Sequence, residues 1–454
     1  MSLPRYPEYK DSGAQWIGEV PAHWPVLKVK AFTEFCGGGT PSRDNLAYWN
    51  GDIPWVSPKD MKSERITGAE ECITSEGLLN SSSSMVDAGR LLMVVRSGIL
   101  KHTIPVAIND VPVALNQDMK ALRFSEQLAT SDFFLRWVQG LNDALLLAWA
   151  KQGATVESIE HAYLAETLVP LPTLAEQHVI AIFLDRETAK IDALIAEQEK
   201  LLALLAEKRQ ATISHAVTRG LNPNAPMKDS GIPWLGEVPA HWEVRSISSV
   251  STKITNGYVG PTRDLFVDDG VRYLQSLHIK GNRIQFDPPY FVRQEWSEQH
   301  GKSILDVGDV LIVQTGDIGQ SAVVTEEFAG CNCHALIIVA PLREQLDGRW
   351  LSWVLNSDYG VHSLLSIQTG ALHPHLNCGN VKGLYVPLPP LEEQAGIVEY
   401  IDDVGGRYRA LSDDVAMGIG LLRERRSALI SAAVTGKIDV RKTVARESES
   451  GVTA

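Results

Sequence analysis

The sequence contains the same unit twice, one copy about 217 residues after the other. Residues 10–24 recur as residues 228–242, with twelve of the fifteen positions identical. Residues 169–177 recur as residues 386–394 at nearly the same offset. A repeat this long is not a solenoid, whose repeats run roughly 20–50 residues. It indicates a tandem duplication of a whole domain with its connector. The alternative is a duplication in which one copy has lost its role.

Each copy contains a β-rich domain. The apolar runs 91–95 and 310–313 each follow a glycine-containing turn and predict buried strands. Residues 133–150 and 352–365 have helical spacing, so we expect a helix on the sheet in each domain. The predicted fold class is α+β: two pseudo-symmetric repeats, each a β-rich α/β domain followed by a long helix.

The long helix of the first copy is expected from about Ala175 to Thr218, and that of the second copy closes at residues 431–436. Long helices owe most of their stability to a packed apolar face, and both show heptad spacing. We therefore expect an antiparallel coiled coil, with packing into an ordinary core as the alternative. The residues expected at this helix-pair or partner interface are Leu184, Ile191, Leu194, Leu201, Leu205, Ile401, Tyr408, Leu411, Val415 and Leu422.

The repeat sets the expected domain boundaries. The first domain covers residues 1–170 with a lead-in at 1–35, and the central helix covers 171–220. The second domain covers 221–385 with a lead-in at 226–245, the C-terminal helix covers 386–440, and 441–454 is expected to be a disordered tail.

Composition limits the class of protein. A chain of 454 residues with 44% hydrophobic and 21% charged residues is typical of a globular protein, and no apolar run approaches a membrane span. We expect a cytoplasmic protein of a bacterium or archaeon, with no membrane partner. Five cysteines without paired spacing indicate reduced thiols and no metal site. The net charge of −13 argues against a nucleic-acid binder that acts without local basic patches or a partner.

The repeated motifs resemble those of the specificity subunit of type I restriction–modification systems. The resemblance rests on the Leu-Pro-x-Leu-x-Glu-Gln segments at 171–177 and 388–394, and on residues 229–242 with their echo at 11–24. It covers nearly the whole chain. It implies two target-recognition domains that each read half of a split, asymmetric DNA sequence, held apart by two antiparallel helices.

The same resemblance implies the partners. Double-stranded DNA is the ligand, and two DNA-methyltransferase subunits bind the chain and supply adenine methylation. S-adenosylmethionine is expected in those subunits, so no cofactor is expected in this chain. Restriction subunits can join such a complex and supply the nuclease.

Polar side chains on loops are the candidates for base reading, because loops carry recognition on a scaffold that both copies share. Arginine and lysine read guanine, and asparagine and glutamine read adenine. The DNA-binding candidates are Thr40, Ser42, Arg43, Lys59, Arg96, Lys101 and Gln152 in the first domain, and Tyr258, Arg263, His278, Lys280, Gln314, Thr315, Gln368 and His373 in the second.

An Asp-Pro-Pro-Tyr run at 287–290 raises the alternative of a DNA methyltransferase fused to its own recognition domain. In that chemistry the aromatic ring stacks on a flipped base. It also needs a nucleotide-binding fold with a glycine-rich loop, which the preceding segment lacks. We therefore expect a turn into a strand here, no catalytic residue, and structural roles for His23 and His241. A coiled-coil adaptor without a DNA role is a further alternative.

Overall fold

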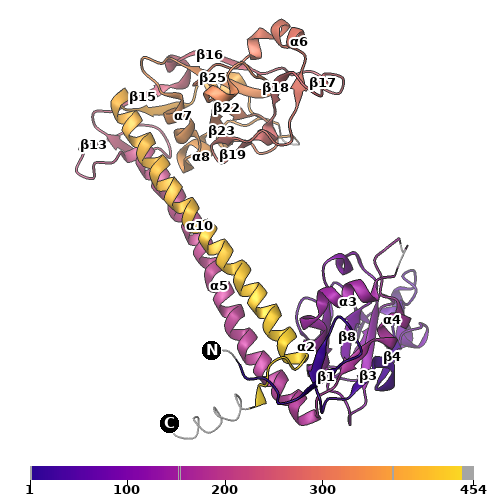
Figure 1. Ribbon diagram of the computed structural model, residues 1–454. Helices are drawn as coiled ribbons and strands as arrows, with labels where there is room; N and C mark the ends of the chain where they lie inside the picture. The colour runs from indigo at the N-terminus through magenta and orange to yellow at the C-terminus, as the bar shows by residue number, and fades with distance from the viewer. Residues whose placement is uncertain (1–2, 152, 154, 371–372, 442–454) are drawn as a thin grey trace. The chain divides into compact units, whose positions relative to one another are not determined.

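The computed structural model describes residues 3–151, 153, 155–370 and 373–441, and the chain forms two compact units (Figure 1). Unit 1 comprises Met1–Gln198 and Met417–Ala454, and unit 2 comprises Glu199–Ala416. Each unit therefore contains one domain and part of both long helices, α5 (Leu174–Arg219) and α10 (Leu391–Val434). The expected tail lies outside the described residues except for Arg441. None of the described helices is long and apolar enough to cross a membrane.

Unit 1 is built on a five-stranded sheet of order β4-β11-β8-β9-β6. The central strand β8 (Leu91–Val94) is apolar and fully buried, as the sequence predicts, and it runs antiparallel to β11 (Met119–Phe124). Helix α2 (Ser131–Gly140) packs on this sheet. The other elements are β1 (Tyr9–Asp11), β2 (Glu19–Pro21), β3 (Val26–Lys28), β4 (Thr33–Gly37), β5 (Trp49–Val56), β6 (Arg65–Ile66), β7 (Cys72–Ile73), α1 (Ser75–Leu79), β9 (Val106–Asn109), β10 (Ala114–Leu115), α3 (Asn142–Trp149), α4 (His161–Glu166) and β12 (Leu168–Pro170).

Unit 2 repeats this plan on a four-stranded sheet of order β16-β25-β22-β23. Its central strand β22 (Val310–Val313) is fully buried and antiparallel to β25 (Leu336–Pro341), and α7 (Gly348–Leu355) packs on it. The other elements are β13 (Met227–Asp229), β14 (Glu237–Pro239), β15 (Glu243–Ser246), β16 (Ser251–Asn256), β17 (Phe266–Val267), β18 (Val271–Leu274), β19 (Ile279–Lys280), β20 (Arg283–Ile284), β21 (Phe291–Val292), α6 (Gln294–Gln299), β23 (Ser321–Val323), β24 (Asn332–Cys333), α8 (Asp358–Ser366), α9 (Cys378–Lys382) and β26 (Tyr385–Leu388).

The helical segment behind each sheet consists of two helices, and the prediction of a single one is wrong. In unit 1, α2 ends at Gly140 and α3 begins at Asn142, whose side-chain oxygen accepts the backbone N–H of Ile104 at 2.8 Å. In unit 2, the Ser357 hydroxyl accepts the N–H of Gly360 at 3.2 Å and caps α8. The bond of Ser357 is a local bond from a side chain to the backbone, which favours helix ends over helix interiors.

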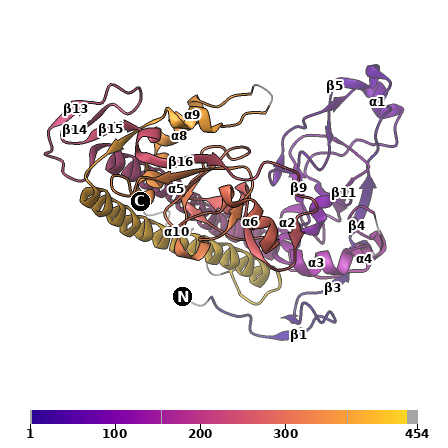
Figure 2. The ribbon, with the colours of Figure 1, turned by 90° about the horizontal axis from the view of Figure 1, so that it is seen from above.

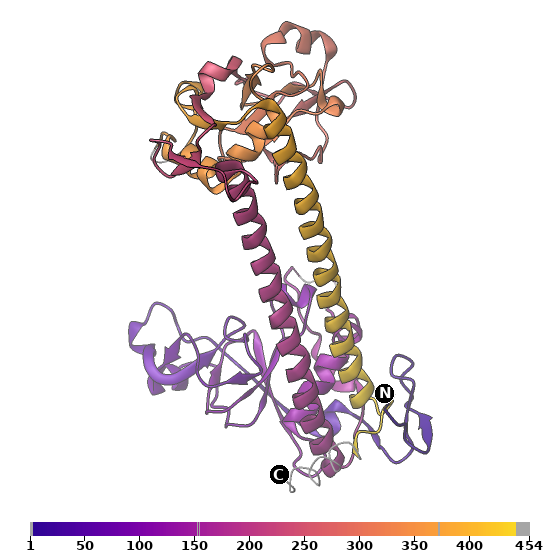
Figure 3. The same cartoon turned by 90° about the vertical axis from the view of Figure 1, so that its left-hand side faces the viewer.

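The segments of α5 and α10 lie antiparallel and side by side in each unit (Figure 3). In unit 1, Arg426 Nε donates a hydrogen bond to Asp192 Oδ1 at 2.8 Å. In unit 2, Ile213 of α5 and Ile401 of α10 belong to one buried cluster. The predicted antiparallel pairing of the helices is therefore confirmed within each unit.

The heptad spacing predicts two rows in each helix, which begin at Leu184 and Glu187 in α5 and at Ile401 and Val404 in α10. This prediction is right for the first row of each helix and wrong by one position for the second. The rows that start at Leu184 and Ile401 are buried or half-buried, as expected. The second row of each helix follows the first by four residues instead of three. This second row includes polar side chains. The apolar spacing therefore pointed to the exposed leucines one position earlier, which are Leu194, Leu201 and Leu411. The actual second rows are Thr188, Ile195, Leu202 and Arg209 in α5, and Gly405, Ser412, Ile419 and Arg426 in α10.

The corrected seam predicts different effects for two adjacent leucines. Leu205 is 8% exposed and Leu204 is 51% exposed, while replacement by alanine raises the helix propensity slightly and equally at both positions. Leu205→Ala is expected to lower the free energy of unfolding of unit 2 by about 2 kcal/mol, and Leu204→Ala by less than about 0.5 kcal/mol. Chemical denaturation followed by circular dichroism measures both. Equal losses would contradict the seam.

Candidate nucleic-acid interface

The glutamine of each repeated Glu-Gln pair fastens a long helix to its own domain. Gln177 is fully buried, and its side-chain oxygen accepts the N–H of Thr130 at 2.9 Å while its amide donates to the Leu128 carbonyl at 2.7 Å. Gln394 holds unit 2 in the same way and accepts the N–H of Asp347 at 2.9 Å. A buried amide with satisfied partners fixes one geometry, because leaving those partners unpaired is costly.

The glutamate of the pair binds the repeated lead-in segment. His23 Nε2 lies 2.9 Å from Glu176 Oε1, and His241 Nε2 lies 2.8 Å from Glu393 Oε2. Burial would raise the pKa of Glu176, but hydrogen bonds from His23 and Thr173 outweigh it and hold this pKa below its ordinary value. The prediction that both histidines are structural is confirmed.

The sheet topology brings the candidate loops of unit 1 to one edge. Strands β4 and β8 both run antiparallel to β11, so Gly37 lies opposite Lys120 and Val94 lies opposite Met119. The C-terminal ends of β4 and β8 are therefore neighbours. We define the recognition edge of unit 1 as the loops that follow them and the described part of the loop beside them, residues 37–43, 95–102, 150–151, 153 and 155–159.

Unit 2 has an equivalent recognition edge, formed by residues 257–263, 314–320, 367–370 and 373–377. Strands β16 and β22 flank β25, so their C-terminal ends lie together. Residues 373–377, which lead into α9 (Figure 2), join this edge, because the Leu376 N–H donates to the Gln314 carbonyl at 2.9 Å. Unit 1 has the matching bond from the Ile159 N–H to the Val95 carbonyl at 2.8 Å.

Two candidate arginines of unit 1 are already engaged by the protein. Arg43 Nη2 donates to Glu71 Oε2 at 2.9 Å, and its guanidinium lies 3.8 Å from the ring centre of Trp49. Arg96 Nε donates to Asp118 Oδ1 at 2.6 Å. Both arginines remain exposed, so each presents only its remaining donors to DNA.

The other unit 1 candidates that the structure describes are all exposed. Thr40, Ser42, Lys59 and Lys101 are exposed, and Gln152 lies outside the described residues. No carboxylate pairs with Lys59 or Lys101 in the part of the chain that the structure describes. These two ammonium groups are therefore the most available cations among the unit 1 candidates.

His278 does not lie on an accessible loop, so its prediction as a DNA contact is wrong in this conformation. Its side chain is fully buried. The Gln275 N–H donates to Nδ1 at 2.9 Å, and Nε2 lies 2.9 Å from the Pro288 carbonyl. Both ring nitrogens are thus used, and burial lowers the pKa of the imidazole. A polar residue type alone did not reveal that it faces inward.

An unpaired buried oxygen distinguishes Gln314 from the other unit 2 candidates. Its side-chain oxygen is buried and has no hydrogen-bond partner among the described residues, although leaving such an oxygen unpaired is costly. An amide is also the group that pairs with adenine. Tyr258 is half-buried like Gln314, and the exposed candidates are Arg263, Lys280, Thr315, Gln368 and His373. Which of them contact bases stays a prediction.

The Asp-Pro-Pro-Tyr run leads into β21, as expected, with a bend at Pro288 in place of the expected turn. The Tyr290 ring lies 4.8 Å from the ring of Phe266, centre to centre, so it packs on the protein's own aromatic surface.

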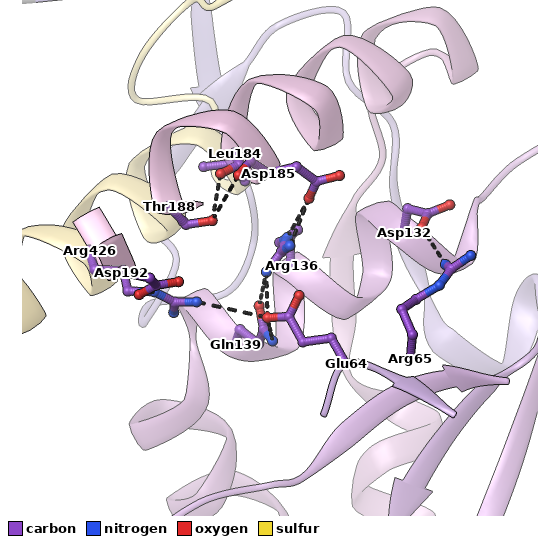
Figure 4. Close-up of polar contacts among 10 residues, drawn as sticks. All are labelled: Glu64, Arg65, Asp132, Arg136, Gln139, Leu184, Asp185, Thr188, Asp192 and Arg426. Carbon is purple, nitrogen blue, oxygen red and sulfur yellow. Dashed lines mark hydrogen bonds and ion pairs between the residues drawn. The ribbon is translucent and has the colours of Figure 1, made fainter. Parts of the chain in front are cut away.

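Sequence reasoning missed a charged cluster at the junction between the domain and the helix pair of unit 1 (Figure 4). Arg136 of α2 is 7% exposed and donates to Glu64 Oε1 and to Asp185 Oδ1, both at 2.7 Å. Burial would raise the pKa of Glu64, but the hydrogen bond and charge of Arg136 outweigh it and keep this pKa below its ordinary value. An arginine inside the otherwise apolar run 133–138 was the available signal.

A family model described as the type I restriction modification DNA specificity domain matches residues 21–203 and again residues 239–411. One match falls on each copy of the repeat, and together they cover most of the chain. The protein therefore belongs to this family, and its role is DNA sequence specificity within a type I restriction–modification system.

Individual relatives agree with this family. The EcoR124I/EcoR124II specificity subunit of Escherichia coli is 38% identical over 188 residues, which are 41% of this chain and 45% of that protein. The MjaIX specificity subunit of Methanocaldococcus jannaschii is 23% identical over 95% of this chain and 97% of its own length. A solved structure on complex assembly and conformational transition of the type I R-M system has a TM-score of 0.70 at 17% identity, covering 92% of this chain and 99% of the other. That likeness shows the same fold.

Proposed function

We propose that this chain reads a split, asymmetric DNA sequence, one half with each unit, and holds two adenine methyltransferase subunits on the DNA. The supporting observation is a repeated scaffold with different loops. Both units keep the buried central strand, the Glu-Gln anchor and the lead-in hairpin in the same register. Their recognition edges carry different polar side chains, which suits two different half-sites.

Exposed apolar side chains on the helices support partner subunits. Such side chains on a soluble protein mark a surface that another chain covers when they are grouped. Unit 1 exposes Leu194, Met417 and Leu421 on its helical segments, and unit 2 exposes Leu201, Leu204 and Leu411. The chain has a net charge of −13, so the partner subunits would supply much of the positive charge that contacts the DNA phosphates. Restriction subunits would join the same cytoplasmic complex.

We assign the chemistry to the methyltransferase subunits, which would bind S-adenosylmethionine, and no catalytic step to this chain. The alternative of an intrinsic methyltransferase rests on residues 287–290. Its aromatic ring is packed against Phe266, where a flipped base would have to stack. Binding of S-adenosylmethionine by the isolated chain would support that alternative instead.

Genome-wide adenine methylation tests the proposed function. The chain is expressed with its neighbouring methyltransferase subunit in a bacterial host that lacks its own systems, and long-read sequencing records the marks. We expect one split motif that is methylated on both halves only when both proteins are present. Expression of either protein alone is the control. A continuous motif, or methylation by this chain alone, would contradict the proposal.

The mass of the purified complex tests the assembly. We expect one copy of this chain with two methyltransferase subunits in light scattering after size exclusion. A stable complex with a single methyltransferase would contradict the two-subunit arrangement.

A further inference from the structure

The junction between recognition domain and helix pair can be compared position by position in the two units. Gln177 and Gln394 hold the starts of α2 and α7 through the same bonds, which fixes an offset of 217 residues for these helices. The first residues of β6 and β20 are Arg65 and Arg283, at an offset of 218. Positions in α5 correspond to positions in α10 at the same offset of 217, so Arg209 corresponds to Arg426.

In unit 1 the charges at this junction are paired with one another (Figure 4). Arg426 pairs with Asp192 at 2.8 Å, and Arg65 Nη1 lies 3.3 Å from Asp132 Oδ1. Arg136 is bonded to two carboxylates, as described above. The eight junction positions of unit 1, which hold four acids and three bases, are Glu64, Arg65, Asp132, Arg136, Gln139, Asp185, Asp192 and Arg426.

Unit 2 has lost most of these carboxylates. Arg409 stands where unit 1 has Asp192, Arg349 where it has Asp132, and Asn282 where it has Glu64. The ion pair between Arg426 and Asp192 thus becomes a pair of like charges. The equivalent positions of unit 2, which hold one acid and four bases, are Asn282, Arg283, Arg349, Trp353, Asn356, Asp402, Arg409 and Arg209.

The single remaining acid is already in use. Arg349 Nη2 donates to Asp402 Oδ2 at 2.6 Å. In the described part of the chain no carboxylate pairs with Arg209, Arg283 or Arg409. Burial, and then the charges of Arg409 and Arg283, lower the pKa of the Arg209 guanidinium. Its Nε atom is buried with no partner among the described residues, so this side chain has a donor to offer.

These arginines surround empty space. A cavity of about 360 Å³ is lined by Asn282, Arg283, Trp353 and Arg409, and by the ion pair of Arg349 and Asp402. A neighbouring cavity of about 490 Å³ shares Asn282 and Trp353 with it and is also lined by Arg209 and Asp358. At the equivalent positions unit 1 has the carboxylates of Glu64, Asp132 and Asp192.

We propose that the cavity of unit 2 lined by Arg283 and Arg409 binds an oxyanion. Its occupant in the DNA complex is a phosphate of the DNA backbone. Planar guanidinium groups match the geometry of phosphate oxygens. The cavity also adjoins the recognition edge, because the Gly281 N–H donates to Gln320 Oε1 at 3.2 Å and Gln320 ends the 314–320 loop. This inference rests on the proposed DNA-reading function and adds a contact that positions unit 2 on the duplex.

Two matched charge reversals on α10 test the site. Arg409 lines the cavity, whereas Arg407 is exposed and pairs with Asp403 at 2.7 Å. Thermal unfolding of the full chain is compared in chloride and in inorganic phosphate at equal ionic strength. Phosphate stabilises folded proteins in general, so the site is reported by the difference between variants. We expect phosphate to raise the melting temperature of the wild type and of Arg407→Asp by more than that of Arg409→Asp. In chloride, Arg409→Asp should melt above the wild type, because it restores the ion pair that unit 1 has.

DNA binding by the complex with the methyltransferase identifies the occupant. Arg409→Asp should lower the slope of log affinity against log salt concentration by about 1, and should do so for any duplex sequence. Arg407→Asp should leave the slope unchanged. Phosphate stabilisation with an unchanged slope would overturn the DNA assignment and point to a partner's carboxylate. An equal phosphate effect on the wild type and on Arg409→Asp would overturn the site itself. A wild-type complex that binds no DNA would instead contradict the proposed function.

Discussion

Replacing Gln177 with leucine is expected to lower the free energy of unfolding of unit 1 by about 3 kcal/mol, because each buried polar group left unpaired costs about 1–3 kcal/mol. The substitution removes the bonds to the Thr130 N–H and to the carbonyls of Leu128 and Pro172. Leucine has nearly the same volume, so the loss reports these bonds and not a cavity. Gln394→Leu should have the same effect in unit 2, where the same three bonds exist.

The matched control for this experiment is Gln127→Leu, since Gln127 is exposed on the loop that precedes α2. Chemical denaturation of the full chain gives the free energies, and hydrogen exchange at the Thr130 amide locates the loss in unit 1. A change below about 1 kcal/mol for Gln177→Leu would show that water replaces the amide and that the motif does not fasten the helix.

Replacing Arg136 with alanine is expected to cost unit 1 about 3 kcal/mol, the lower end of the range for breaking a buried ion pair by removing one partner. The side chain is 7% exposed, and its loss leaves the half-buried carboxylate of Glu64 without its main partner. Adding Glu64→Gln should recover part of the loss, because the unpaired charge is then removed.

Arg65→Ala provides the comparison on the same cluster. Its ion pairs with Asp110 and Asp132 lie at the surface, so it should cost less than about 1 kcal/mol. Chemical denaturation of the three variants measures the set. Equal costs for Arg136→Ala and Arg65→Ala, or no recovery with Glu64→Gln, would contradict the description of a buried cluster.

The duplication made much of the architecture predictable. Because residues 10–24 and 169–177 recur, two equivalent domains and two helices followed directly from the sequence. The apolar runs that became β8 and β22 were recognisable because a strand buried on both faces is apolar throughout. The histidines and glutamates of the lead-in contacts could be named, but their pairing required the fold.

The errors have a common cause, which is that residue type does not report the direction of a side chain. Thr188 and Arg209 lie in the seam although they are polar, and Leu194 lies outside it although it is apolar. His278 is polar and fully buried. The like-charge pair of Arg209 and Arg409 could be recognised only after the structure showed that their unit 1 equivalents form an ion pair.

Exchange of one recognition domain tests most directly the central claim that each unit reads its own half-site. Residues 37–165 are replaced by those of a relative with a different motif, which retains Gln177, both long helices and all of unit 2. Methylation is then mapped genome-wide in the presence of the methyltransferase. We expect one half of the motif to change, while the other half and the spacer stay the same. A change in both halves, or in neither, would contradict the claim.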